Sequence, residues 1–581
     1  IEQCMAIQSE AGEVQFGYTK LGARALEIDP LGNTTRYRYD LLSNLIAKVL
    51  PNQYDEKTGD GSCYRYEYDA MDHRIRSTDP LGNVFAPPPD TGGGGGGGRK
   101  ASPHAAAGRL AMEVNPNTYD PATKSGQGVR YEYDTDDRRV KVIYPDGGVR
   151  RLKYDSMGRL VKVIEPEQYD PQTDDGSGYT YRYDAAGRLE EIVNPDGAVG
   201  KRYVYNLRGL VVKEISAEGY LAGDTDEARI GTMHRYNAAG WLLETREPVS
   251  RTEDGAVQYR LTQYAYDANG NRTEEKRFLS FQDEESAKGS IHTLSFAYDK
   301  QNRLVRVSDG LGAVVRYQYD GLNRRIQETR LLAEGLPQII HYRYDPAGRL
   351  IEVEQSADPE GCGERFASTR YEYDRNGNLT RILLPAGGEV LREYDAANRL
   401  TAEIHREAAS GIDNRTEFGY DAAGNLVEIT DNQGRKTRIA YDLMNREIRR
   451  IERDGGVQRT IYDRNGQVVR LIRPNEYDAQ TDGGEGFQFT YDAQGRVLTV
   501  LSPEGQVLQT NTYDASGRLL QRLDGMGSGV KYEYDLAGDQ RRIMTMGGAS
   551  QELEYDARGL ITGIADNNRK QGHEMACSTQ N

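Results

Sequence analysis

The chain contains 581 residues, of which 90 are acidic and 74 basic, and its formal net charge is −16. This balance excludes a broad nucleic-acid interface, which requires clustered lysine and arginine. The sequence holds no apolar run long enough for a membrane-spanning helix. Its four cysteines, Cys4, Cys63, Cys362 and Cys577, are far apart and form no CxxC pair, so neither a disulfide framework nor a zinc site is predicted.

Tyrosine dominates the aromatic residues, with 40 Tyr against 9 Phe and 1 Trp. A tyrosine ring packs in an apolar layer while its hydroxyl reaches water or a polar partner. The mean hydropathy of −0.76 is low for a chain of this length. Both features favour a thin protein layer close to solvent over a thick apolar core.

Residues 1–17 are predicted to be a partial repeat or a strand that enters a repeat array. The array occupies residues 18–565 and is built on the motif Tyr-Asp-x-x-Gly-Arg-Leu, and the tail 566–581 loses the repeat. Degenerate copies begin at Tyr18 and His104. Close copies begin at Tyr154, Tyr183, Tyr344 and Tyr513, and looser copies begin at Tyr39, Tyr68, Tyr133, Tyr205, Tyr236, Tyr266, Tyr298, Tyr319, Tyr373, Tyr394, Tyr420, Tyr441, Tyr462, Tyr491, Tyr534 and Tyr555.

Some repeats are lengthened by an insert of nearly fixed sequence. The basic step between motifs is 21 residues, and a second step of 29 residues carries the insert. Its copies are PNQYDEKTGDG from Pro51, PNTYDPATKSG from Pro116, PEQYDPQTDDG from Pro166 and PNEYDAQTDGG from Pro474. We interpret the insert as a longer hairpin loop, with a recognition loop, for instance at residues 169–176, as the alternative.

Residues 84–103 interrupt the array and contain an unbroken glycine run at residues 92–98. Such a run is typical of a flexible linker. A disordered loop, an engineered splice and a stretch of unassigned residue identities all explain it.

Each repeat is predicted to be two strands and two turns. In residues 313–326, Val315, Tyr317 and Tyr319 alternate with Arg316 and Gln318, which is the period of a strand with two different faces. The strand ends at the motif tyrosine and enters a hairpin turn.

The turn residues explain the motif. In the repeat at Tyr183, Asp184 is expected to accept a backbone N–H two residues on, and Gly187 to supply a left-handed position. A strand over residues 189–193 returns, followed by a second turn at residues 194–197. The structural residues predicted on this basis are Tyr39, Asp40, Tyr154, Asp155, Gly158, Tyr183, Asp184, Gly187, Arg188, Tyr344, Asp345, Gly348, Tyr513, Asp514 and Gly517.

About 22 such hairpins give on the order of 40 antiparallel strands, and an open twisted sheet of that length must curl, split or close. The predicted fold class is therefore all-β: an array of antiparallel hairpins that forms a spiralling β-sheet shell, as a hollow cocoon or barrel. Such a wall encloses more space than its own side chains fill.

The motifs YDAAGRL at Tyr183 and YDPAGRL at Tyr344, with the 21-residue step, resemble the RHS/YD-repeat family. This family includes bacterial RHS polymorphic toxins, TccC-type subunits of Tc toxins, wall-associated proteins and animal teneurins. The resemblance implies a repeat-region fragment whose β-strip closes into a shell around a C-terminal toxin domain. The terminal segment that supports self-cleavage in toxin members has no match after Tyr555, and no toxin domain follows.

His573, Glu574 and Cys577 come close to a metalloprotease HExxH, but no third ligand is visible and a tail without this role is favoured. His292 and His341 lie on predicted strands, where packing or solvent contact is expected. The motif aspartates are interpreted as turn caps in preference to calcium ligands. The Tyr and Arg ladders are interpreted as cross-strand pairs that stabilise the sheet, in preference to a site for glycans or polyanions. No catalytic, cofactor-binding or metal residue is predicted.

The sequence thus predicts a non-catalytic encapsulating shell of a bacterial RHS-type toxin, with no cofactor. Its expected partners are an encapsulated C-terminal toxin domain, absent from this chain, and a secretion or delivery component. We expect a protein that is made in the bacterial cytoplasm and then secreted or delivered. The alternative is a cell-surface or wall-associated scaffold that binds glycans or protein partners.

Overall fold

The computed structural model describes residues 3–9, 12–69, 71–85, 104–105, 109–123, 125–220, 224–251, 255–281, 291–331, 337–356, 366–555 and 560–566. Two compact units make up the chain. Unit 1 comprises Ile1–Val149, Arg316–Thr460 and Arg473–Asn475, and unit 2 comprises Arg150–Val315, Ile461–Ile472 and Glu476–Asn581. Apart from one short 3-10 helix, η1 (Pro116–Thr118), every regular element in the described residues is a β-strand. The prediction of an all-β fold is confirmed.

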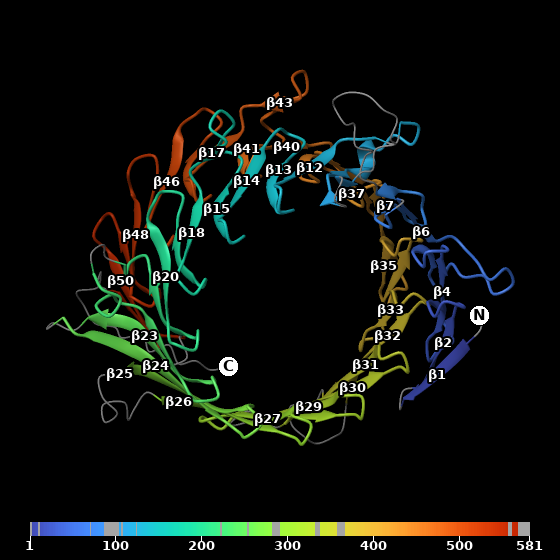
Figure 1. Cartoon of the computed structure of the whole chain (residues 1–581), viewed down its shortest axis with the longest axis horizontal. Helices are drawn as coiled ribbons and strands as arrows, with labels where there is room; N and C mark the ends of the chain where they lie inside the picture. The colour runs from blue at the N-terminus through green and yellow to red at the C-terminus, as the bar shows by residue number, and fades with distance from the viewer. Residues whose placement is uncertain are drawn as a thin grey trace. The chain divides into compact units, whose positions relative to one another are not determined.

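Nearly every strand pairs with its neighbours in chain order (Figure 1). The first sheet has eight strands: β1 (Gln3–Ser9), β2 (Gly12–Tyr18), β3 (Arg24–Ile28), β4 (Thr34–Tyr39), β5 (Leu45–Val49), β6 (Tyr64–Tyr68), β7 (Arg74–Thr78) and β8 (Val84–Phe85). The glycine-rich segment that follows lies mostly outside the described residues.

The second large sheet has 37 strands in one antiparallel meander. They are β11 (Met112–Val114), β12 (Gly128–Tyr133), β13 (Arg139–Ile143), β14 (Val149–Tyr154), β15 (Leu160–Ile164), β18 (Tyr179–Tyr183), β19 (Leu189–Val193), β20 (Val199–Tyr205), β21 (Val211–Ser216), β22 (Thr232–Tyr236), β23 (Leu242–Arg251), β24 (Val257–Tyr266), β25 (Arg272–Phe281), β26 (Ile291–Tyr298), β27 (Leu304–Asp309), β28 (Val314–Tyr319), β29 (Arg325–Leu331), β30 (Gln338–Tyr344), β31 (Leu350–Ser356), β32 (Phe366–Tyr373), β33 (Leu379–Leu383), β34 (Glu389–Tyr394), β35 (Leu400–Arg406), β36 (Asp413–Tyr420), β37 (Leu426–Thr430), β38 (Lys436–Tyr441), β39 (Glu447–Ile451), β40 (Val457–Tyr462), β41 (Val468–Ile472), β44 (Phe487–Tyr491), β45 (Val497–Leu501), β46 (Val507–Tyr513), β47 (Leu519–Leu523), β48 (Gly529–Tyr534), β49 (Gln540–Thr545), β50 (Ser550–Tyr555) and β51 (Ile561–Asp566).

Three further sheets have two strands each: β9 (His104–Ala105) with β10 (Arg109–Leu110), β16 (Tyr169–Asp170) with β17 (Asp175–Gly176), and β42 (Tyr477–Asp478) with β43 (Gly483–Gly484). The last two pairs lie within the inserts that begin at Pro166 and Pro474. These inserts are therefore small hairpins in their own right.

The hairpin of the repeat at Tyr183 has the predicted form. Strand β18 ends at the motif tyrosine, strand β19 returns over Leu189–Val193, and the register shifts by a β-bulge at Tyr183. Gly187 has a φ of +80°, in the left-handed region that glycine adopts at little cost. The backbone N–H of Asp184 donates to the carbonyl of Arg188, which closes the turn.

The apolar core is thin, as the tyrosine-rich composition predicts. Four of the five most deeply buried large side chains in the described part are Val49, Ile164, Ile215 and Ile472. Each of them stands at or next to the end of a strand that runs into an insert or a long loop. Glycines make room for this packing, since a Cβ at Gly176 or Gly484 would meet the Ile164 or Ile472 side chain at 3.1 or 2.9 Å.

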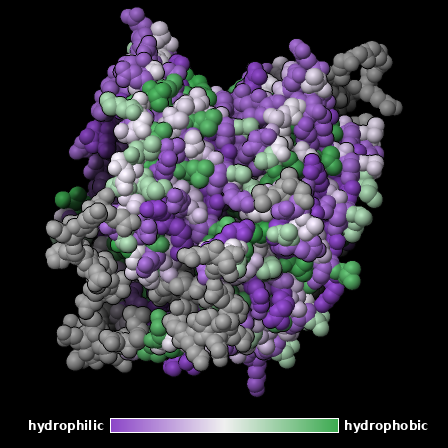
Figure 2. Space-filling model, turned by 90° about the vertical axis from the view of Figure 1, so that its left-hand side faces the viewer, coloured by the Kyte–Doolittle hydropathy of each residue, from purple (hydrophilic) through white to green (hydrophobic). Residues whose placement is uncertain are grey.

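Hydrophilic and hydrophobic side chains are interspersed on the face shown in Figure 2, with hydrophobic residues scattered among polar ones. Scattered apolar residues are ordinary on a soluble surface, whereas a large contiguous patch marks an interaction site. Within the described residues, no helix is both long and apolar enough to cross a membrane.

Candidate functional site: the Tyr-Asp turn and its contacts

The aspartate of each Tyr-Asp motif organises its own turn. Asp184 Oδ1 accepts the backbone N–H groups of Ala186 and Arg188, each at 2.9 Å. The first of these bonds is the one expected two residues on. Asp184 Oδ2 accepts Nε of Arg188 at 2.7 Å, a charge-assisted bond within the turn. The Arg188 side chain is the largest cause of the lowered pKa of Asp184.

The same arrangement recurs at other predicted turns. Asp155 Oδ1 accepts the N–H of Met157 and of Arg159, and the backbone bond from Arg159 is the main reason that the pKa of Asp155 is lowered. Side-chain partners of the motif aspartates are Arg349 for Asp345 and Arg518 for Asp514, at 2.6 Å each, and Asn44 for Asp40 at 3.2 Å. Gly158, Gly348 and Gly517 have φ values of +81°, +83° and +90°.

The motif tyrosine ties each repeat to the repeat before it. The Tyr183 hydroxyl donates to the backbone carbonyl of Leu160 at 2.8 Å. Leu160 is the first residue of the returning strand of the preceding repeat. Equivalent bonds run from Tyr344 to the Arg325 carbonyl at 2.9 Å and from Tyr513 to the Val497 carbonyl at 2.9 Å. Burial is the main reason that the pKa of Tyr183 is raised, because the charged phenolate would lose solvation there.

The motif arginine joins the same two repeats, reaching from the earlier repeat to the tyrosine of the later one. The guanidinium of Arg159 lies 4.7 Å from the centre of the Tyr183 ring, and that of Arg188 lies 4.5 Å from the centre of the Tyr205 ring. Arg188 also donates through Nη1 to the carbonyl of Asn206 at 3.1 Å, in the next turn. One arginine thus binds its own aspartate, stacks on the next tyrosine and caps the next turn. These contacts are those of an interlocked structural ladder.

The inserts make a second kind of contact, between segments far apart in the sequence. In unit 1, Asn52 donates through Nδ2 to Asp374 Oδ2 at 2.8 Å and accepts the N–H of Arg375 at 3.1 Å. Asn117 donates to Asp421 Oδ2 at 2.8 Å and accepts the N–H of Ala423 at 3.2 Å. Both asparagines follow the insert proline, and both bind a Tyr-Asp turn more than 300 residues later.

Unit 2 repeats this contact with glutamate. Glu167 Oε1 accepts the N–H of Arg464 at 2.9 Å, in the turn that follows Tyr462. Glu218 Oε1 accepts the N–H of Ser516 at 2.9 Å, and Glu218 Oε2 accepts a hydrogen bond from the Ser516 hydroxyl. In both units, therefore, an Asn or Glu side chain caps exposed N–H groups of a later Tyr-Asp turn.

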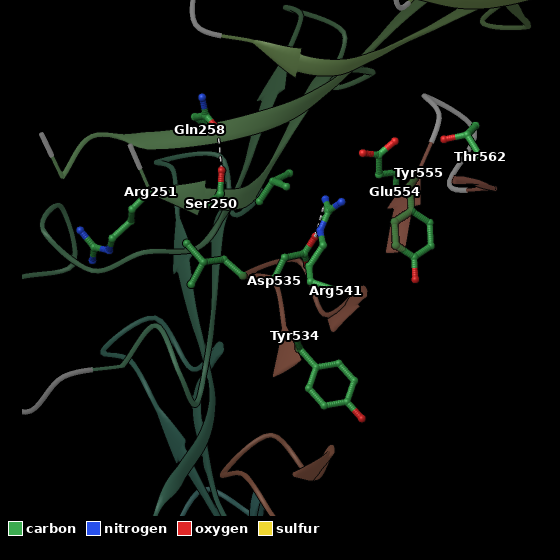
Figure 3. A pocket seen from close by; sticks show the side chains of 11 residues that line it. Ser250, Arg251, Gln258, Tyr534, Asp535, Arg541, Glu554, Tyr555 and Thr562 are labelled. Carbon is green, nitrogen blue, oxygen red and sulfur yellow. Dashed lines mark hydrogen bonds and ion pairs between the residues drawn. The ribbon is translucent and has the colours of Figure 1, made fainter. Parts of the chain in front are cut away.

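A cavity of about 810 Å³ lies in unit 2 (Figure 3). Ser250 Oγ donates to Gln258 Oε1 at 2.5 Å, and Arg541 Nε donates to Asp535 Oδ2 at 3.0 Å. Burial raises the pKa of Asp535, whose carboxylate also accepts the N–H of Asp539. Ser250 is paired with an amide and not with a base, so its hydrogen bond gives it no activation as a nucleophile.

The other candidate residues find ordinary places or lie outside the described residues. His341 lies on β30, and its Nδ1 is 3.9 Å from Glu354 Oε2 on the neighbouring strand β31. His292 lies on β26 opposite Arg277. The segment with His573, Glu574 and Cys577, like residues 92–98, is outside the described residues. In the described part of the chain no three His, Cys, Asp or Glu side chains are placed to hold a metal ion.

Two family models match this chain. The model described as Teneurin YD-shell matches residues 321–482 and 452–573, and the model described as RHS Repeat matches residues 133–169, 172–199 and 298–335. The matched residues of this chain belong to the RHS/YD-repeat family. The sequence resemblance is confirmed, and with it the YD-shell fold class.

Curated relatives of this RHS/YD-repeat chain include two bacterial proteins with named activities. It is 26% identical to the double-stranded DNA deaminase toxin A of Burkholderia cenocepacia over 390 residues, which are 62% of this chain and 23% of the relative. It is 25% identical to the tRNA3(Ser)-specific nuclease WapA of Bacillus spizizenii over 221 residues, 38% of this chain and 8% of the relative. The chain thus spans less than a quarter of either relative.

Solved structures show the same fold at lower sequence identity. The Photorhabdus luminescens Tc holotoxin pore with the mutation TccC3-D651A matches with a TM-score of 0.59 and 13% identity, over 95% of this chain and 31% of that chain. The crystal structure of TcdB2-TccC3-TEV matches with a TM-score of 0.55 and 14% identity, over 94% of this chain and 30% of that chain. This RHS/YD-repeat chain therefore spans about a third of the solved chains.

Proposed function

We propose that this chain is the repeat wall of a bacterial RHS-type toxin, and that it encloses a C-terminal toxic segment until delivery. The observation that carries the proposal is the difference in chemistry between its two curated relatives. One is named as a nuclease of a tRNA and the other as a deaminase of double-stranded DNA. Repeats that match relatives of such different chemistry cannot by themselves specify either reaction, which supports a non-catalytic role for the repeats.

The contacts within the strip suit a wall. Each hairpin is tied to its neighbour by the backbone ladder, the tyrosine hydroxyl and the stacked arginine. Single ties of these kinds are each worth about 1 kcal/mol, and a repeat array adds them along its length. The result is a stiff polar sheet whose proposed action is steric: it separates a cargo from the cytoplasm of the producer. Cargo and delivery component are the proposed partners, and the mature protein is proposed to act outside the producer.

The proposal is tested on the whole polypeptide in which this chain occurs. Limited proteolysis is followed by mass spectrometry of the segment after residue 581, with that segment expressed alone as the control. We expect the segment to be cut at least tenfold more slowly in the whole protein, and equally fast once denaturant has opened the repeats. Equal rates in native buffer would overturn enclosure. Equal rates together with recovery of the protein on the cell surface would instead support the surface scaffold.

A further inference from the structure

The insert that begins at Pro474 has the same internal build as the insert that begins at Pro166. Tyr169 donates its hydroxyl to Asp174 Oδ1 at 2.7 Å. Tyr477 donates its hydroxyl to Asp482 Oδ1 at 2.6 Å in the same way. Both inserts form a two-stranded hairpin, β16 with β17 and β42 with β43. Their aspartates, Asp170 and Asp478, cap the same kind of turn, and each binds a threonine hydroxyl at 2.8 Å.

The Pro474 insert differs from the inserts at Pro51 and Pro166 in the exposure of its first residues. Pro51 and Pro166, which precede the docking residues Asn52 and Glu167, are buried. Pro474 is exposed, and Asn475 is exposed beside it. The Asn475 side chain makes no hydrogen bond to any of the described residues, although its counterparts Asn52 and Asn117 make two each to a distant turn. The turn that ends at Gly456 packs against Pro474, but in the described part of the chain no Tyr-Asp turn is hydrogen-bonded to the Asn475 side chain.

Sequence separation indicates which turn would reach Asn475. The side chains that dock on a Tyr-Asp turn reach it across 297 residues for Glu167, 298 for Glu218, 304 for Asn117 and 322 for Asn52. A turn at the same separation from Asn475 would lie beyond residue 581. The solved chains that share this fold are much longer, since this chain covers 30% and 31% of them.

We propose that Pro474 and Asn475 form a docking site for a Tyr-Asp turn of a repeat strip outside these 581 residues. The Asn475 carboxamide accepts an N–H of that turn and donates to its aspartate, as Asn52 does at Asp374. The site is a strip-to-strip contact, so it does not depend on whether the strip encloses a cargo.

The turns bound by Asn52 and Asn117 also indicate which kind of Tyr-Asp turn an insert asparagine binds. Asn52 and Asn117 each share their aspartate with an asparagine four residues on, Asn378 for Asp374 and Asn425 for Asp421. An asparagine at that position leaves Oδ2 of the aspartate open to a second amide donor, whereas an arginine there covers it with a guanidinium.

Glutamate follows the opposite rule at one site. Glu218 docks on a turn whose fourth residue after the aspartate is Arg518, and the Arg518 guanidinium lies 3.6 Å from the Glu218 carboxylate. A glutamate beside an aspartate needs such a cation, because like charges at contact distance repel. At Glu167, where the turn has Gln467 instead, burial and then the Glu167 charge raise the pKa of Asp463. Asn475 therefore selects a turn of the form Tyr-Asp-x-x-Gly-Asn.

Photo-crosslinking in the whole polypeptide tests the site. A small diazirine side chain is placed at position 474, and the captured peptide is identified by mass spectrometry. We expect capture of a Tyr-Asp-x-x-Gly-Asn turn from outside residues 1–581. The same label at position 51 is the positive control, and it should capture the peptide around Asp374. A label at the exposed Gln480, on the loop between β42 and β43 of the same insert, should give no detectable amount of that product.

Each outcome supports or overturns a named part of the proposal. No capture from position 474, when position 51 captures its turn, overturns the docking site. Capture of a turn with arginine at the fourth position overturns the selectivity. Mixing isotope-labelled and unlabelled protein shows whether the captured turn belongs to a second copy. Capture of the turn at Asp267 of such a copy would place the occupant inside residues 1–581 and overturn its source. Protease protection of the cargo is unaffected by any of these results, so the two proposals fail separately.

Discussion

The hydroxyl of the motif tyrosine is the smallest group whose loss should loosen one repeat from the next. Tyr183→Phe removes a bond of 2.8 Å to the Leu160 carbonyl and keeps the ring on which the Arg159 guanidinium stacks at 4.7 Å. The change therefore isolates the hydrogen bond from the cation–π contact. Tyr181→Phe, on the same strand β18, is the matched control, because the Tyr181 hydroxyl has no hydrogen-bond partner among the described residues.

The expected size follows from the bond removed. A hydrogen bond from a partly buried hydroxyl to a backbone carbonyl contributes about 1 kcal/mol net. In a repeat array this loss falls on the interface of two neighbouring repeats. A loss of about 1 kcal/mol raises the local opening constant about fivefold. Tyr181→Phe should change it by less than about a factor of two, because it removes no hydrogen bond to the described residues.

Native-state hydrogen exchange is the appropriate assay, because a chain of this length with two compact units is not expected to unfold in a single step. Amides of β15 and β18 should exchange about fivefold faster in Tyr183→Phe, while amides several repeats away keep their rates. Equal exchange in the Tyr183 and Tyr181 variants would refute the inter-repeat role of the hydroxyl. Faster exchange throughout the chain would refute its local character.

Three further outcomes follow from the turn geometry and its charges. Because the pKa of Asp184 is lowered, chiefly by Arg188, the stability it contributes is present above about pH 4 and lost as the pH falls through the folded value; Asp184→Asn should abolish this acid dependence in local hydrogen exchange. Burial raises the pKa of Tyr37 to about 12, so its contribution is present below about pH 10 and lost as the pH rises towards 12; ultraviolet titration of tyrosinate should show this late component disappear in Tyr37→Phe. Gly187→Asn should cost only a few tenths of a kcal/mol and Gly187→Val about 1–2 kcal/mol in local native-state hydrogen exchange, since Asn302, Asn323, Asn398 and Asn445 hold the equivalent position at φ of 60–64°; equal costs would contradict the left-handed requirement.

Local features of the repeat were predictable because they rest on neighbouring residues. The alternation before Tyr319 gives β28 over Val314–Tyr319, and Leu189–Val193 form a strand with the predicted bounds. Asp184 Oδ1 accepts the backbone N–H two residues on, and Gly187 has the expected left-handed φ. Each of these outcomes depends on a stretch of about five residues.

The bonds between repeats were not predictable in the same way. The sequence suggested cross-strand pairing of tyrosine and arginine, but not that Arg188 would bind Asp184, stack on Tyr205 and cap Asn206 together. These contacts depend on how one hairpin is set against the next. The loop after Ile215 was also missed as an insert, because Ala217 stands where the other inserts have proline and its loop is longer. A Glu or Asn two residues before a tyrosine, as in Glu218 and Tyr220, is the signal that would have found it.

The contacts of the insert residues depend on the longest range of all. Asn52 meets Asp374 across 322 residues, and Glu218 meets Ser516 across 298. That separation is set by twist and curvature that accumulate strand by strand, so a small change in each hairpin would shift the turn that arrives at the insert. The matched pairs of asparagine with asparagine-type turns and of Glu218 with an arginine-type turn are therefore a second layer of information. Within each unit they fix which later turn meets a given insert residue, and the hairpin geometry alone does not determine this. An insertion of a single 21-residue repeat between Asn52 and Asp374 would bring a different turn to Asn52, and an arginine-type turn there would leave the carboxamide of Asn52 competing with a guanidinium for one carboxylate oxygen.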